Sequence, residues 1–211
     1  QGMAFTDAHS PSAVCTPTRY GALTGRYCWR SRLKRGVLNG YSAPLLEPGR
    51  LTVAGILRAS GYHTSIVGKW HLGAEPYSPL QHGFDVDIPH HTGPGPGRTY
   101  VAPWTFKHIK ENYPGEHIED RMSEEAITWM NAVSEDKPFF MNYWMFSVHG
   151  PWNAKQELIE KYEGEIDPAS EQKSATYAAM VHSLDDAVGT LLDEINRKGI
   201  ADNTVIIFTS D

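Results

Sequence analysis

The sequence has few cysteines and no long apolar run. Cys15 and Cys28 are the only cysteines among 211 residues, too few for the disulfide framework of a small secreted domain. The two could pair with each other, or Cys15 could be a free, buried thiol. No apolar segment of the printed sequence is long enough to span a bilayer. Cysteine content therefore leaves the redox compartment open.

Positive charge is also scarce. The chain carries 19 Lys and Arg against 25 Asp and Glu, a net charge of −6, which excludes the broad basic surface that nucleic acid requires. Hydrophobic residues make up 40% of the chain, enough to bury the core of one globular domain. We interpret one local basic cluster as a solvated face rather than the rim of an anionic-substrate site: Arg26, Arg30, Arg32, Lys34 and Arg35.

A nucleophile candidate, a helix start and a fixed cation lie close together near the beginning of the chain. Proline is favoured at the first helical position, so the sequence predicts Thr16 as the N-cap and residues 17–23 as the opening turns of a helix. Cys15 then lies just ahead of the positive end of the helix, and Arg19 lies one turn further in. This arrangement is suited to holding an oxyanion.

An α/β pattern follows. Helical spacing over residues 51–59 ends at Gly61, and the β-prone residues 62–67 come next. Lys69 and His71 leave the carboxyl end of that predicted strand, where chemistry gathers in open α/β sheets.

The pattern repeats in the second half of the chain. Ser123 is predicted to open a helix, and the dense apolar run 139–148 predicts a central strand covered on both faces. A long amphipathic helix over residues 175–197 precedes a second buried strand at 203–209. Alternating helices and strands of this kind indicate an α/β fold.

Other features carry weaker signals. His149 and Asp211 each stand after a predicted strand. His90 and His91 lie in a Gly- and Pro-rich loop, and without a second ligand pair we interpret them as solvent-facing or substrate-facing rather than metal-binding. Loops 36–49 and 87–103 carry no readable motif, and we expect substrate specificity to lie there.

Two elements of this sequence resemble those of one enzyme family. Cys15-Thr16-Pro17-Thr18-Arg19 followed by Leu23-Thr24-Gly25 resembles the active-site element of the type I sulfatases, although the commonest form has serine in place of Thr18. Residues 61–71 resemble the second sulfatase element. The resemblance implies an alkaline-phosphatase-like α/β fold with a mixed, mostly parallel sheet and helices on both faces. It also implies that residues 1–211 are the central part of the catalytic domain, truncated at both ends.

The resemblance implies a function for each matching residue. In the family the cysteine is oxidised to formylglycine by a maturation enzyme, and the aldehyde hydrate attacks sulfur. By this resemblance, Cys15 would be the precursor of the nucleophile and Arg19 would hold the hydrate. Lys69 would bridge the hydrate and the sulfate. His71 would be the base for collapse of the hydrate, and His149 would be the acid for the departing alcohol.

A divalent cation is implied as well. By resemblance, Asp211 and the modified Cys15 would ligate Ca²⁺, a hard cation suited to oxygen ligands. The family's Asp pair is missing ahead of Cys15, and the Asn that would follow Asp211 is absent. We therefore expect the 211 residues not to assemble the full metal site alone.

The resemblance leaves three functions open. The first is a sulfatase acting on a sulfated carbohydrate or aryl sulfate, in a secreted, periplasmic or lysosomal protein. The second is a phosphodiesterase or phosphonate monoester hydrolase of the same fold. The third is a noncatalytic relative that binds sulfated sugars without converting Cys15.

Overall fold

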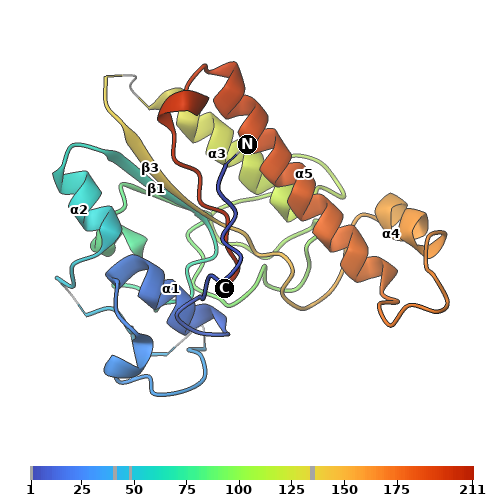
Figure 1. Ribbon diagram of the computed structural model, residues 1–211, viewed down its shortest axis with the longest axis horizontal. Coiled ribbons are helices and arrows are strands. Elements are labelled where there is room, and N and C mark those ends of the chain that lie inside the picture. Colours follow the sequence, from blue (N-terminus) through green and yellow to red (C-terminus); the bar gives the residue numbers. More distant parts are fainter. Residues whose placement is uncertain (1, 40–41, 48, 134–135) are drawn as a thin grey trace.

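The chain forms a small parallel sheet flanked by helices (Figure 1). The computed structural model describes residues 2–39, 42–47, 49–133 and 136–211. The strands are β1 (His63–Gly68), β2 (Val86–Ile88) and β3 (Phe139–Trp144), in the order β2-β1-β3. The helices are α1 (Cys15–Thr24), α2 (Val53–Ala59), α3 (Ile118–Ala132), α4 (Gln156–Glu163) and α5 (Ala175–Arg197), with 3₁₀ turns at Cys28–Arg30, Pro79–His82 and Ala201–Asn203.

Both strand pairs are parallel, so the three carboxyl ends meet at one edge. Val67 lies beside Ile88 of β2 and Tyr143 of β3. Gly68 closes β1 with φ of +106°, and a Cβ there would lie 2.0 Å from the Trp144 carbonyl oxygen. The close approach of these two strand ends therefore requires glycine.

Successive residues of β1 pack into different cores. Ile66 packs with Tyr20 and Leu23 of α1 and Ala54 of α2, whereas Val67 packs in a cluster with residues of α3 and α5. Figure 1 shows α1 and α2 on one side of the sheet and α3 with α5 on the other. Helices thus cover both faces of the sheet, as predicted. Among the described residues, no helix combines the length and apolar character needed to cross a bilayer.

Helix α3 begins earlier than predicted. It starts at Ile118, where the His117 side chain accepts a hydrogen bond from the Glu119 N–H. Ser123, the expected opening residue, lies inside the helix, and its hydroxyl donates to the Asp120 carbonyl. The prediction was wrong because a histidine, rather than a serine, caps this helix.

The two apolar runs also differ from their predictions. Strand β3 ends at Trp144 instead of residue 148, and it is a half-buried edge strand of the described sheet rather than a central one. Residues 203–209 do not form a strand: Val205, Ile207 and Phe208 are 88%, 82% and 74% exposed. No strand of the described part of the chain lies against this segment to pair with it or cover it. Helix α5, by contrast, has the predicted bounds.

Candidate active site

Cys15 is the first residue of α1. Val14 is the N-cap, and its carbonyl accepts hydrogen bonds from the Thr18 N–H at 3.2 Å and the Thr18 hydroxyl at 2.9 Å. Thr16 was wrongly predicted as the cap. Its hydroxyl instead donates to the His71 carbonyl at 3.2 Å and accepts from the Leu38 N–H. Cys15 therefore lies within the first turn, where the unpaired N–H groups of the helix favour an anion.

Arg19 is the buried cation of this site. Nη1 donates to the Lys69 carbonyl at 2.8 Å, Nη2 pairs with the Asp211 carboxylate at 2.7 Å, and the guanidinium lies 4.8 Å from the centroid of the Trp144 ring. Burial lowers the pKa of Arg19, while the charges of Asp211 and Cys15 oppose that shift. The guanidinium stays charged, because arginine is not deprotonated in proteins. It thereby fixes the carboxyl ends of β1 and β3 against α1.

Lys69 is 3% exposed. Burial lowers the pKa of Lys69, and the nearby Arg19 charge lowers it further, whereas Cys15 and Asp211 oppose the shift. Lys69 therefore lies within interaction range of the Cys15 thiol and of the Asp211 carboxylate. Its backbone N–H donates to the Trp144 carbonyl at 2.7 Å, which holds the residue at the junction of β1 and β3.

His71 is buried and adopts a left-handed backbone conformation, with φ of +58°. Its Nε2 lies 2.6 Å from the Leu38 carbonyl oxygen. A carbonyl can only accept, so Nε2 carries the proton and Nδ1 keeps a lone pair. Nδ1 is buried and has no hydrogen-bond partner among the described residues.

The protonation of His71 follows from its surroundings. Burial lowers the pKa of His71 to about 4, and the charges of Lys69, Arg19 and His149 act in the same direction. The ring is therefore neutral at pH 7 and can accept a proton at Nδ1. An uncommon backbone conformation at such a residue fits the general clustering of strain at functional sites.

His149 is exposed and follows β3 in the connection to α4. Its Nδ1 lies 2.6 Å from the Gly150 carbonyl oxygen, so Nδ1 donates and Nε2 faces away from that bond. A Cβ on Gly95 would lie 3.0 Å from Nδ1, so the 91–95 loop packs directly against the imidazole. The His149 ring is close enough to His71 to lower the pKa of His71.

The predicted site residues thus come together from four parts of the chain. Contacts or charge interactions link Cys15, Arg19, Lys69 and Asp211 directly, and His71 joins them through Thr16 and through its charge interactions. His149 is linked to the set through His71.

Asp211 was predicted as a metal ligand together with Cys15. Its carboxylate is engaged by Arg19, and its side chain is 37% exposed. Within the described ranges, no three His, Cys, Asp or Glu side chains are grouped so that they could hold a metal ion. Ca²⁺ takes six to eight oxygen ligands, so the donors present here do not fit a complete calcium site.

The other sequence interpretations have mixed outcomes. Cys15 and Cys28 are free thiols and form no disulfide, and the five-residue basic cluster is exposed as predicted. His90 does not face solvent or substrate freely: Nδ1 pairs with Asp87 at 2.7 Å and Nε2 with Glu75 at 3.2 Å. The 36–49 loop includes positions 40, 41 and 48, which lie outside the described residues.

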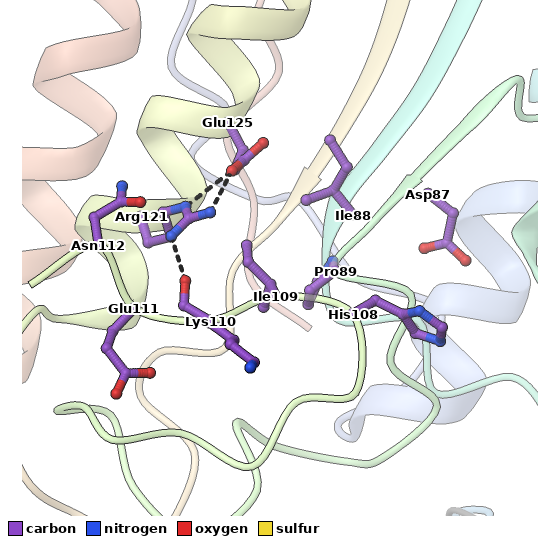
Figure 2. A pocket seen from close by; sticks show the side chains of 10 residues that line it. All are labelled: Asp87, Ile88, Pro89, His108, Ile109, Lys110, Glu111, Asn112, Arg121 and Glu125. Atoms are coloured by element: carbon purple, nitrogen blue, oxygen red, sulfur yellow. Dashed lines mark hydrogen bonds and ion pairs between the residues drawn. The ribbon is translucent and has the colours of Figure 1, made fainter.

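A separate pocket of about 420 Å³ lies beside the carboxyl end of β2 (Figure 2). The 87–103 segment, which was predicted as a loop, contributes Asp87 and Ile88 of β2 and the following Pro89 to its lining, together with His108 and Arg121. Figure 2 shows Arg121 bound to the Glu125 carboxylate and the Lys110 carbonyl. None of the predicted site residues lines this pocket.

Sequence reasoning missed the residues that support the site from behind. Trp144 contacts Arg19 through its ring and Lys69 through its carbonyl. Tyr100 and Glu119 are fully buried and hydrogen-bond to the segment that carries His149. One sequence signal could have pointed to Glu119. This carboxylate stands next to the apolar stripe of α3 formed by Ile118, Met122 and Ala126. A charge in such a position is costly unless it is paired, which indicates a specific partner.

The whole chain, residues 1–211, matches the family model described as Sulfatase. It is 32% identical over 238 residues to arylsulfatase A of Homo sapiens, an alignment that covers 100% of this chain and 45% of that protein. It is 27% identical over 234 residues to N-acetylgalactosamine-6-sulfatase of Homo sapiens, covering 100% of this chain and 43% of that protein.

A solved structure shares the fold. The crystal structure of Ps i-CgsB superposes with a TM-score of 0.75 at 26% identity, covering 94% of this chain and 48% of that chain. This likeness confirms the α/β fold class. The chain spans less than half the length of each of these three proteins.

Proposed function

Because the chain belongs to the sulfatase family, we propose that the full-length protein carrying it hydrolyses a sulfate ester to an alcohol and inorganic sulfate. We also propose that these 211 residues are the central part of its catalytic domain. The observation that carries the proposal is the meeting of Cys15, Arg19 and Lys69 at the N-terminal end of α1. A helix N-terminus with two buried cations is suited to an anionic ester and to the charge that builds on its oxygens.

Position 15 is the proposed nucleophile. Oxidised to formylglycine by a maturation enzyme, the residue would supply an aldehyde hydrate, in which one hydroxyl attacks sulfur and the other expels sulfate by collapsing to the aldehyde. The geometry supports this role because Cys15 is half-buried, unpaired with Cys28 and set at the positive end of α1.

The neighbouring side chains have distinct tasks in this proposal. Arg19 balances negative charge at position 15, and Lys69 bridges that position and a sulfate oxygen. His71 is neutral at pH 7 with a free lone pair at Nδ1, which suits a proton acceptor. His149, at the exposed side of the site, protonates the departing alcohol.

The proposed metal is a single Ca²⁺ with Asp211 and the modified residue 15 among its ligands. The described residues do not group a full set of donors, so we propose that the remaining oxygen ligands come from other parts of the full-length protein. The Asp211 carboxylate belongs to the same cluster as Cys15, because Arg19 pairs with it at 2.7 Å and Lys69 interacts with both groups.

The proposed substrate is a sulfated carbohydrate or an aryl sulfate. N-acetylgalactosamine-6-sulfatase and arylsulfatase A, both similar to this chain, carry these two substrate classes in their names. The proposed location is secreted, periplasmic or lysosomal, as the family resemblance implies.

Mass spectrometry and kinetics of the full-length protein test the function. We expect the peptide that carries residue 15 to be lighter than its cysteine form, and we expect aryl sulfate to be turned over faster than an aryl phosphate diester. Cys15→Ala should abolish turnover, whereas the matched Cys28→Ala control should retain it. An unmodified Cys15 with no turnover would favour a sugar-binding relative, and preference for the phosphate diester would favour a phosphodiesterase.

A further inference from the structure

The segment that carries His149 is held by two buried side chains from other parts of the chain. Glu119, in the first turn of α3, accepts a hydrogen bond from the Ser147 N–H at 2.7 Å. Tyr100 places its hydroxyl 2.6 Å from the Phe146 carbonyl oxygen and 2.9 Å from that of His149 itself. These contacts leave the 146–149 backbone with little freedom, although the His149 side chain is exposed.

Tyr100 is in turn fixed on its other sides. Its N–H donates to the Asn153 side chain at 2.7 Å, and Asn153 donates to Thr99 at 2.7 Å. Its ring stacks on His117 with 5.7 Å between centroids. The hydroxyl is therefore presented to the 146–149 backbone by a rigid support.

Glu119 is an unusual choice for so buried a position. It is 0% exposed, and a buried carboxylate is costly unless hydrogen bonds compensate it. Burial raises the pKa of Glu119 to about 7, with the Asp120 charge adding to the rise, while hydrogen bonds from Ser147 and Phe146 oppose it. An apolar residue would fill the space without this cost but would leave the Ser147 N–H without its acceptor.

We propose that Tyr100 and Glu119 form a clamp that sets the position of His149, and that both are therefore positioning residues for the proton His149 delivers. The proposal rests on the function proposed above. Loss of the clamp would displace His149 and weaken protonation of the leaving alcohol. The residues around Cys15 would stay in place, so the other steps would be unaffected.

Leaving-group dependence separates this role from a purely structural one. A nitrophenolate departs readily without a proton, whereas a phenolate with electron-donating substituents needs one. General acid catalysis contributes on the order of 10²-fold or more to such reactions. Loss of the clamp should therefore slow poor leaving groups on the order of 10-fold more than good ones.

The experiment compares kcat/KM for a series of substituted phenyl sulfates in the full-length protein. Glu119→Met and Tyr100→Phe each remove one of the two contacts and should make kcat/KM depend more steeply on the pKa of the leaving group. Glu119→Gln keeps an acceptor for the Ser147 N–H and should show the same dependence as the unmodified protein. Glu116→Met is the matched control, because Glu116 is equally buried but accepts from Asn112. Equal slowing of every substrate by Glu119→Met would overturn the proposal.

A double-mutant cycle and a spectroscopic readout complete the test. In a His149→Ala background, Glu119→Met should cause no further loss if it acts through the histidine; an additional loss of its full size would contradict the clamp. NMR of histidine-labelled protein should show a shifted His149 ring signal in Glu119→Met and an unshifted one in Glu116→Met. This arm decides the clamp even if no sulfate ester is hydrolysed, an outcome that would count against the proposed function alone.

Discussion

His71 shows how one side chain is prepared for proton transfer by its surroundings. Its Nε2 proton is held by a backbone carbonyl, its Nδ1 is bare, and two fixed cations plus burial disfavour a second proton. Sequence placed Lys69 and His71 together after a strand, but it could not reveal the tautomer, which depends on Leu38, 33 residues away.

We expect His71 to make folding sensitive to acid. Because burial lowers its pKa from 6.5 to about 4, the unfolded chain binds a proton between these pH values that the folded chain excludes. The free energy of unfolding should therefore fall by about 3 kcal/mol as the pH drops from 6.5 to 4. The matched variant is His71→Asn, because asparagine tolerates a positive φ. In denaturant titrations, the free energies of unfolding of the full-length protein and of this variant should approach each other as the pH falls from 6.5 to 4. Parallel profiles would contradict the prediction.

At the scale of elements, some boundaries could be read from sequence and others could not. Helix α5 was predicted because its apolar periodicity is long and Gly199, with φ of +68°, follows its end. The start of α3 was missed because His117 performs a task that sequence rules assign to Ser or Asp. The 203–209 segment was read as a buried strand from composition alone, but burial depends on neighbours that composition does not contain.

The junction of β1 and β3 gives a test at this scale. In Gly68→Ala the added methyl group would lie 2.0 Å from the Trp144 carbonyl oxygen, at a residue whose φ is positive. We expect the two strand ends to separate. The free energy of unfolding should fall by more than the roughly 1–3 kcal/mol typical of backbone strain alone. Gly61→Ala is the matched control, since Gly61 has φ of +90° but nothing within 4 Å of the added Cβ. Thermal unfolding should show the larger loss for position 68; equal losses would mean that the close contact is readily relieved.

At the scale of the whole molecule, the candidate site is built at the shared carboxyl edge of a parallel sheet. Sequence could predict this edge, because polar residues follow three successive strand-like runs. It could not predict that Asp211 would be held by Arg19, or that Tyr100 and Glu119 would reach the His149 segment, because these contacts join residues 28 or more positions apart.

Calcium binding tests how far the proposed site extends beyond this chain. We expect the full-length protein to bind one Ca²⁺ in calorimetric titrations, and we expect Asp211→Ala to weaken binding at least 10-fold, because a carboxylate ligand is lost. Asp186→Ala, which removes an exposed carboxylate of α5, is the control and should leave the affinity unchanged. Unaltered affinity in Asp211→Ala would remove Asp211 from the proposed ligand set.

The exposed 205–208 segment has a practical consequence. Four consecutive apolar side chains are exposed on a segment that no described strand pairs with, and exposed, β-prone apolar segments without a partner favour cross-β association between molecules. We expect a preparation limited to these 211 residues to aggregate through this segment, which light scattering would measure. A lysine at position 207 would act as a gatekeeper against that association and keep such a preparation in solution.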